Sequence, residues 1–317
     1  MSEERDDLPL FSTPLPGLRT ERPRPARPRA GTALTAAIEA WAAALTQAGR
    51  SPHTVKAFSA DLRLLAQFIG GGQPVSAIGT HDLRRFLDWM LKGRRVPCSP
   101  KTYSRRVTSL KSFFRWLVDE GILAADPAAP VPQQTVLSPI PEVLTDDDVK
   151  AILRSADRLR HADPPDARPE TLFRLLLHTG IKKGECLSLH VHHVDLRSVE
   201  GPILYVRYGD VRKRYKERKL PLDPDWIPVF REYLAQHQPT DQLFPWSPRR
   251  LEYILEDLGN LAGLDKHVSF DMCRWTSALR DYSSGSDRDH IRQKLGLSKI
   301  QWREIGAKLD RLATQAA

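Results

Sequence analysis

Apolar residues recur every three to four positions through most of the chain, which predicts helices. Between residues 34 and 124 this period runs through four segments, and residues that favour helix ends separate them. Gly49 ends the first segment, and Ser51 and Ser99, each followed by proline, begin the second and the fourth. Thr80 is expected to cap the third. We therefore expect a small bundle with helices at 34–49, 52–69, 79–93 and 100–121.

A second domain is expected after a proline-rich stretch. Residues 125–144 contain five prolines and no apolar period, which predicts an extended linker at 125–143. Thr145 then caps a helix with acids in its first turn. Residues 202–222 alternate and are rich in Val, Ile, Leu and Tyr, which indicates a hairpin. The expected fold class is mainly α: a helical domain at 34–124, and a mostly helical domain at 144–317 with a small antiparallel β-sheet.

Composition places the chain among globular proteins. Of 317 residues, 41% are hydrophobic and 27% charged, and no apolar run approaches the ~18 residues of a membrane span. The three cysteines, Cys98, Cys186 and Cys273, form no disulfide or metal pattern, which fits a reducing cytoplasm. The first residues lack a signal peptide's apolar segment. Residues 1–33 are rich in proline and arginine and are predicted to be a disordered arm, either a solubilising tail or a tether along a phosphate backbone.

The charge favours a polyanionic partner. The formal net charge is +9, and the predicted bundle alone carries about +7. In the fourth segment Leu110, Phe113, Phe114 and Leu117 share one side, and basic residues fall on the other. Such a one-sign stripe suits a helix along DNA, although a basic face that only meets solvent stays open. The bundle candidates for DNA contact are Lys56, Lys101, Arg105, Arg106, Lys111 and Arg115.

The order of the motifs resembles the tyrosine recombinases, the phage-integrase and Xer-type family. The likeness covers about residues 34–310. The helices "SPHTVKAFSADLRLLAQFI" and "SPKTYSRRVTSLKSFFRWLVDEGIL" are similar to those of the family's SAM-like core-binding domain. Four later motifs resemble parts of its catalytic domain: "TGIKKGECLSLHVHHVDL", "KRYKERKLPL", "VSFDMCRWTSALRDY" and "IRQKLGLSKIQWREIG".

The resemblance implies a particular chemistry. In such enzymes a tyrosine attacks a DNA phosphodiester and forms a 3′-phosphotyrosine. Two arginines hold the phosphate oxygens, where charge develops, and a hairpin lysine protonates the leaving oxygen. Two histidine positions supply further hydrogen bonds and proton transfer.

This sequence departs from that set at most positions. Lys182 keeps a positive charge but lacks the planar fork of arginine, and Gly306 offers no nucleophile. The last tyrosine of the chain, Tyr282, comes too early to replace it. Lys182 and Arg274 stand at the family's two arginine positions, and Lys213 stands at the position of the hairpin lysine. Asp271 and Leu297 stand at the two histidine positions, and Gly306 stands at the position of the tyrosine.

The leading hypothesis is therefore a double-stranded DNA-binding protein that does not cut strands. Lys182, Lys213 and Arg274 are expected to converge on one phosphate. Its role would be architectural, regulatory or accessory to an active recombinase, in the cytoplasm and at the nucleoid. One alternative is a strand-transferring subunit that uses a nucleophile in trans or another nucleophile. Another is a protein-interaction module, in which the C-terminal helix enters a neighbouring protomer or packs on its own domain.

Neither a metal nor another cofactor is expected. The run "HVHH" would place His190 and His192 on one strand face and His193 on the opposite face, and no cysteine pair completes a zinc pattern. Ser298 could be considered as a substitute nucleophile, but no histidine lies near it in sequence to activate it.

Overall fold

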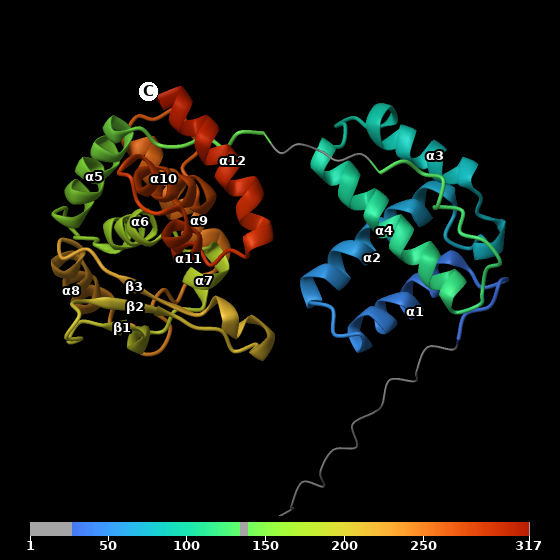
Figure 1. The fold of residues 1–317 in the computed structure, drawn as a ribbon, viewed down its shortest axis with the longest axis horizontal. Helices are drawn as coiled ribbons and strands as arrows, with labels where there is room; N and C mark the ends of the chain where they lie inside the picture. The colour runs from blue at the N-terminus through green and yellow to red at the C-terminus, as the bar shows by residue number, and fades with distance from the viewer. Residues whose placement is uncertain (1–26, 134–138, 317) are drawn as a thin grey trace, which may run out of the picture. The chain divides into compact units, whose positions relative to one another are not determined.

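The computed structural model describes residues 27–133 and 139–316, and the chain divides into two compact units, 1–138 and 139–317 (Figure 1). The first 26 residues of the expected arm lie outside the described residues. Each unit has its own hydrophobic core. The mainly helical fold class, with one small antiparallel sheet in the second unit, is confirmed.

The first unit is a helical bundle. Ser51 and Ser99 cap α2 and α4 as predicted, because their hydroxyl oxygens accept the backbone N–H of Thr54 and Thr102. Gly79, not Thr80, precedes α3, and Asp82 accepts the Gly79 N–H at 3.0 Å. The elements are α1 (Leu34–Gln47), α2 (Pro52–Ile69), the 3-10 turn η1 (Val75–Ala77), α3 (Thr80–Asp88), the π-helical turn η2 (Trp89–Gly93) and α4 (Pro100–Asp119).

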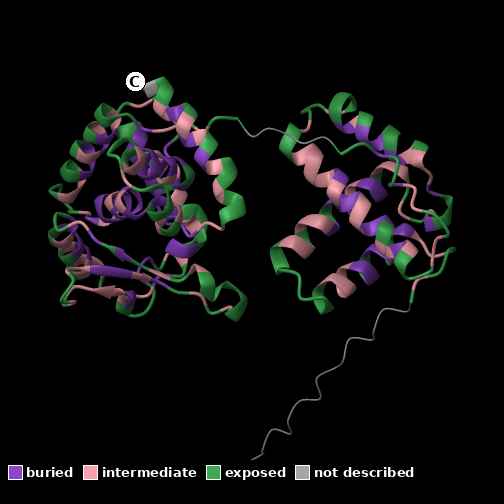
Figure 2. Cartoon of the chain, viewed as in Figure 1, coloured by how far each residue is buried: buried purple, intermediate pink, exposed green. Residues whose placement is uncertain are grey.

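Aromatic side chains fill the bundle core, which is purple in Figure 2. Phe113 and Phe114 are fully buried on the apolar side of α4, and the Trp41 ring meets Phe113 edge-on with 5.4 Å between centroids. The core extends past the expected domain end at 124, because Ala128 and Val131 are buried in it. Single apolar residues between prolines carry no period, so the sequence pattern assigned them to the linker.

The start of the bundle also lies earlier than the pattern indicates. Ala30 and Thr32 accept backbone hydrogen bonds from Ser76 and Val75 at 3.1 and 3.0 Å. Residues 27–33, expected in the arm, therefore include a segment fixed to η1.

The second unit surrounds the buried helix α6 with α5, α8, α9 and α10 (Figure 1). Thr145 caps α5 as predicted, and α6 ends at Gly180 in the left-handed region. The helices are α5 (Asp146–Arg160), α6 (Arg168–Thr179), α7 (Lys183–Leu187), α8 (Trp226–His237), α9 (Pro248–Leu261), α10 (Phe270–Ser283), α11 (Arg288–Lys294) and α12 (Lys299–Ala316).

A three-stranded antiparallel sheet, in the order β1-β2-β3, lies along one side of these helices. It consists of β1 (Val194–Asp195), β2 (Ile203–Val206) and β3 (Arg218–Pro221). Val206 pairs with Arg218 and Tyr205 with Lys219. A six-residue 3-10 element, η4 (Val211–Lys216), joins β2 to β3.

The C-terminal helix α12 packs on its own unit. Leu309 and Leu312 are buried against α10 and α11, together with Trp275 and Ile291. This is one of the two arrangements that the sequence leaves open.

Candidate functional site

The turn between α6 and α7 carries Lys182. Gly180 adopts a φ of 59°, which reverses the chain after α6 and leads it into α7. The backbone N–H of Lys182 donates to Glu185 Oε2 at 2.8 Å, which fixes the turn. The lysine side chain is half-buried, and its Nζ lies 3.5 Å from the carbonyl oxygen of Gly296.

Arg274, on α10, joins this turn to the end of α11. Its guanidinium donates to the carbonyl oxygen of Gly180 and, at 2.6 Å, to that of Leu295. Burial lowers the pKa of Arg274 to about 10, and burial together with Arg274 lowers the pKa of Lys182 to about 8. The two cations therefore lie close together in a partly desolvated place. We call Lys182, Arg274 and their neighbours Glu185 and Arg218 the Lys182–Arg274 site.

Arg218, the first residue of β3, forms a bidentate ion pair with Glu185. Its two terminal nitrogens lie 3.1 and 2.9 Å from the carboxylate oxygens, and its Nε donates to the Lys294 carbonyl at 2.7 Å. Burial favours a raised pKa for Glu185, but the hydrogen bonds and charge of Arg218, with the Tyr208 hydroxyl, bring it down to about 2. Arg218 is thus a second guanidinium beside Lys182, but most of its donors are engaged within the protein.

The loop from Gly296 to Ser298 closes the site. A Cβ on Gly296 would stand 2.8 Å from Arg218 Nη1, so only glycine fits against the ion pair. Leu297 packs partly buried against the α10–α12 cluster and exposes no hydrogen-bonding side chain. A cavity of about 390 Å³ opens here, and its lining includes Tyr215, Lys216, Arg218, Gly296, Leu297 and Ser298.

Of the two hairpin lysines, Lys216 lies on the side of Lys182. Lys216 lines the cavity, and its positive charge acts on Lys182. Lys213 is 52% exposed, and its Nζ lies 4.0 Å from Asp210 on the same loop. The structure therefore brings Lys182 and Arg274 together, with Lys216 near them, and leaves Lys213 at the hairpin tip.

Asp271 and Gly306 occupy different surroundings. Asp271 lies exposed in the first turn of α10, and within the described ranges it forms no ion pair with Arg274. Gly306 is buried in the middle of α12, where a Cβ would meet Trp302 at 3.5 Å.

Two tyrosine hydroxyls near these elements already have acceptors. Tyr208 donates to Glu185, and Tyr282 donates to Asp310 at 2.5 Å. Burial and the neighbouring Glu185 raise the pKa of Tyr208, which opposes formation of a phenolate. Tyr215 differs, because it is 73% exposed at the mouth of the cavity.

Comparison with known proteins shows the family of the chain. The model of the Phage integrase family matches residues 142–305, and the model of its N-terminal SAM-like domain matches residues 38–121. The chain belongs to the phage integrase family. The tyrosine recombinase XerD of Listeria innocua is 24% identical over 282 residues, which cover 84% of this chain and 92% of that protein. The tyrosine recombinase XerC of Chromobacterium violaceum is 27% identical, with 86% and 90% covered.

Solved structures of phage integrases and Xer recombinases share the fold. A lambda integrase dimer bound to a COC′ core site superposes with a TM-score of 0.67 at 15% identity, with 86% of this chain and 77% of that one covered. The XerH recombinase bound to palindromic difH substrate gives 0.66 at 18% identity, with 83% and 78% covered. The resemblance inferred from the motifs is thus confirmed for both domains.

In the SAM-like domain of this phage integrase family member, the basic residues of α4 fall into two groups, those paired with an acid and those that are not. Arg105 and Arg106 pair with the carboxylate of Asp61 on α2, whose side chain is only 4% exposed. Ser109 donates to the same carboxylate at 2.8 Å. These two arginines therefore hold α2 against α4.

Three of the four other basic candidates of the bundle face outward. Lys56, Lys101 and Arg115 are exposed, whereas Lys111 donates to the Ala129 carbonyl at 3.3 Å. Asp61 was the signal for this division, because it is the one acid in "KAFSADLRLLAQF". Its partners on α4 are 44 and 45 residues away, which no local pattern reveals.

The Lys182–Arg274 site also contains residues that the sequence pattern did not single out. Glu185, Tyr208 and Arg218 form its hydrogen-bonded floor, and Glu185 lies three residues after Lys182, the spacing of a helix capping box.

No helix in the described ranges is long and apolar enough to span a membrane.

Proposed function

We propose that this member of the phage integrase family binds double-stranded DNA and does not cleave it. The observation that carries the proposal is the Lys182–Arg274 site itself, where two partly buried cations lie beside a third, Arg218, and Leu297 and Gly306 replace groups that cleavage would need. A phosphate placed between Lys182 and Arg274 would gain charge-assisted hydrogen bonds, since neither side chain has an acidic partner within 4.0 Å among the described residues.

The outward basic residues of the bundle support the same function. Lys56, Lys101 and Arg115 add exposed positive charge on α2 and α4, and such residues contact the DNA backbone without reading sequence. The relatives whose structures contain DNA are consistent with this use of the fold. The protein would act as an architectural, regulatory or accessory factor in recombination, in the cytoplasm and at the nucleoid, and an active tyrosine recombinase would be its partner in the accessory role.

Binding and cleavage can be tested with one substrate, a duplex carrying a nick that traps a covalent adduct. A gel shift at about 50 and about 200 mM salt should show a complex that weakens steeply with salt. Denaturing gels of the same samples should show no protein–DNA adduct. Absence of any complex at low salt would refute the proposal.

Tyr215 supports a second candidate, a strand-cleaving subunit. Its hydroxyl is exposed at the cavity shared by Lys216 and Ser298, and its ring lies 5.3 Å from Lys216 Nζ. This candidate predicts an adduct on the nicked duplex that disappears in Tyr215→Phe. An adduct that persists in Tyr215→Phe would point instead to another nucleophile.

A further inference from the structure

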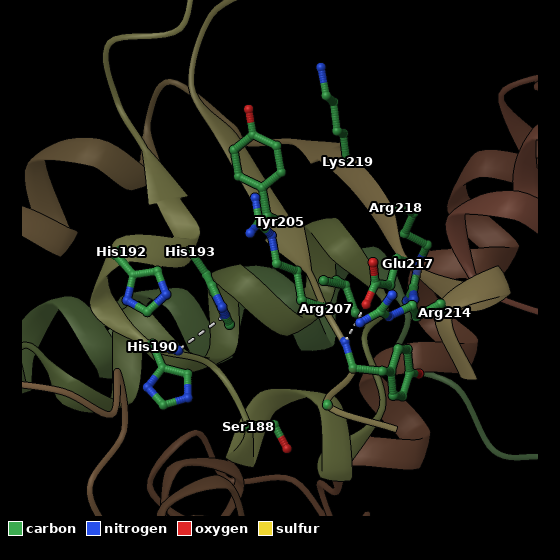
Figure 3. Close-up of a pocket in the computed structure, with 13 residues that line it drawn as sticks. Ser188, His190, His192, His193, Tyr205, Arg207, Arg214, Glu217, Arg218 and Lys219 are labelled. Carbon is green, nitrogen blue, oxygen red and sulfur yellow. Dashed lines mark hydrogen bonds between the residues drawn. The ribbon is translucent and has the colours of Figure 1, made fainter. Parts of the chain in front are cut away.

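The outward face of the sheet carries a pocket whose lining includes neither Lys182 nor Arg274, although Arg218 and Tyr208 of their site border it. Tyr205 and Lys219 pair across β2 and β3 and point to this face, whereas Arg218, next in sequence, points to the helices (Figure 3). The pocket has a volume of about 780 Å³ and is bounded on its other side by the loop with His190, His192 and His193.

Three histidines meet at this pocket, contrary to the expectation that they occupy two faces of a strand. They lie in the 3-10 turn η3 (Val191–His193) and the residue before it, and their ring centroids are 4.6 to 5.3 Å apart. The backbone N–H of His190 donates to His193 Nδ1 at 3.3 Å, so the neutral His193 ring keeps its proton on Nε2 (Figure 3).

The histidine cluster lacks the set of side chains that a metal site needs. Within residues 27–133 and 139–316, no group of three or more His, Cys, Asp or Glu side chains could hold a metal ion. His190 Nδ1 is instead engaged by Asp241 at 2.8 Å.

The pocket is basic on the side of the sheet. Arg207, Arg214 and Lys219 line it, and none of the three forms an ion pair with an acid in the described parts of the chain. Arg207 and Lys219 both lie over the Tyr205 ring, at 5.3 and 5.9 Å from its centroid. The carboxylate of Glu217, which also lines the pocket, accepts the N–H of Tyr208 at 2.9 Å.

An anion would relieve the repulsion within this cluster. Burial, His192 and His190 lower the pKa of His193, and the charge of Arg207 lowers it further. The same groups would stabilise a bound phosphate, with imidazole and guanidinium N–H groups as donors.

We propose that this face of the sheet is a second phosphate-binding surface, filled by the backbone of nucleic acid. A small-molecule site is usually enclosed and mostly apolar. Here the pocket is a polar, open hollow on an exposed sheet face, a shape that suits a polyanion passing over it. The proposal rests on the proposed DNA-binding function but assigns it to residues separate from Lys182 and Arg274.

The salt dependence of duplex binding tests this surface. In the full-length protein, Arg207→Ala with Lys219→Ala should weaken binding and flatten the slope of log K against log salt by about two units, because two phosphate contacts are lost. Both side chains are exposed, so folding should be unaffected. The matched control is Lys150→Ala with Arg154→Ala, which removes two exposed charges from α5 and should leave the slope unchanged.

A chemical readout complements the slope. Duplex DNA should protect His192, which is exposed in the pocket, from diethyl pyrocarbonate and leave His161 on α5 reactive. If the wild type binds DNA but the sheet variant keeps the full slope and His192 stays reactive, the second surface is refuted and the proposed function stands. If the wild type binds no duplex at all, both are refuted.

Discussion

Gly296 and Gly306 lie ten residues apart, yet a side chain has opposite consequences at the two positions. Gly296 has a φ of 57°, and a Cβ there would stand 2.8 Å from Arg218. Gly306 lies within α12, where the nearest atom to a Cβ is 3.5 Å away. Glycine is therefore required at the first position and only weakens the helix at the second.

Alanine substitutions should separate these two cases. Gly306→Ala should raise the free energy of unfolding by about 0.5–1 kcal/mol, because alanine lowers the entropy lost in a helix. Gly296→Ala should lower it by about 1–3 kcal/mol, because the backbone is strained and Arg218 is displaced. Thermal melts of the two variants measure both, and a stabilised Gly296→Ala would contradict the contact described.

Lys182 should make DNA binding depend on pH. Its pKa in the free protein is lowered to about 8, and a bound phosphate favours the charged amine and raises it again. Binding then takes up a proton above about pH 8, so affinity should fall by up to about tenfold per pH unit from there. Fluorescence anisotropy between pH 7 and 9.5 measures this fall. Lys182→Arg should remove it, and an unchanged profile would exclude Lys182 from the contact.

Helix ends and apolar faces were predictable because they depend on residues close in sequence. Ser51, Ser99 and Thr145 cap helices as expected, and Phe113 and Phe114 mark the buried side of α4. The polar links between elements were not predictable. Arg218 pairs with Glu185 over 33 residues, and an isolated acid or base gives no sign of its partner.

The carboxylate of Asp61 should control how firmly α2 is held against α4. Asp61→Ala would leave Arg105 and the less exposed Arg106 without their acid, which should cost about 2–3 kcal/mol. Hydrogen exchange should become faster in both helices and stay unchanged in α6, which belongs to the other unit. Equal acceleration everywhere would show that the effect is global and not confined to this contact.

Packing of α12 on its own unit can be examined with two leucine-sized residues. Leu309 is fully buried against α10, and Ile300 is 79% exposed. Leu309→Ala should cost about 3 kcal/mol, and Ile300→Ala should change stability by less than about 0.5 kcal/mol. Light scattering should give one monomer mass for all three proteins. A larger effect of Ile300→Ala, or a wild-type dimer lost in Leu309→Ala, would favour exchange of the helix between protomers.

The net charge of +9 should give the protein an affinity for any DNA duplex that falls as the salt concentration rises. Of the stripe on α4, Lys101 and Arg115 face outward, whereas Arg105 is tied to Asp61. Lys101→Ala with Arg115→Ala should flatten the slope of log K against log salt by about two units and weaken binding to all sequences alike. Arg105→Ala should mainly lower stability. If the double variant loses more affinity for some sequences than for others, these residues contact bases.

The family and both domains could be recognised from the sequence, because motif order survives even where single residues change. Which hairpin lysine lies near Lys182 could not be recognised in this way. The 3-10 element η4 carries four basic residues close together, and only the fold shows that Lys216 lies near Lys182 while Lys213 lies by Asp210.

The contact of Arg218 with Glu185 and Gly296 sets a rule for how related sequences can drift. Loss of Glu185 strands a buried guanidinium, loss of Arg218 strands a buried carboxylate, and any side chain at residue 296 displaces the guanidinium. Viable descendants should therefore exchange these three positions together or keep all of them. Leu297 lies outside this ion pair and is not bound by the same rule. A single mutation could thus place a hydrogen-bonding residue at position 297. Replacement of Glu185, Arg218 or Gly296 would instead require several mutations at once.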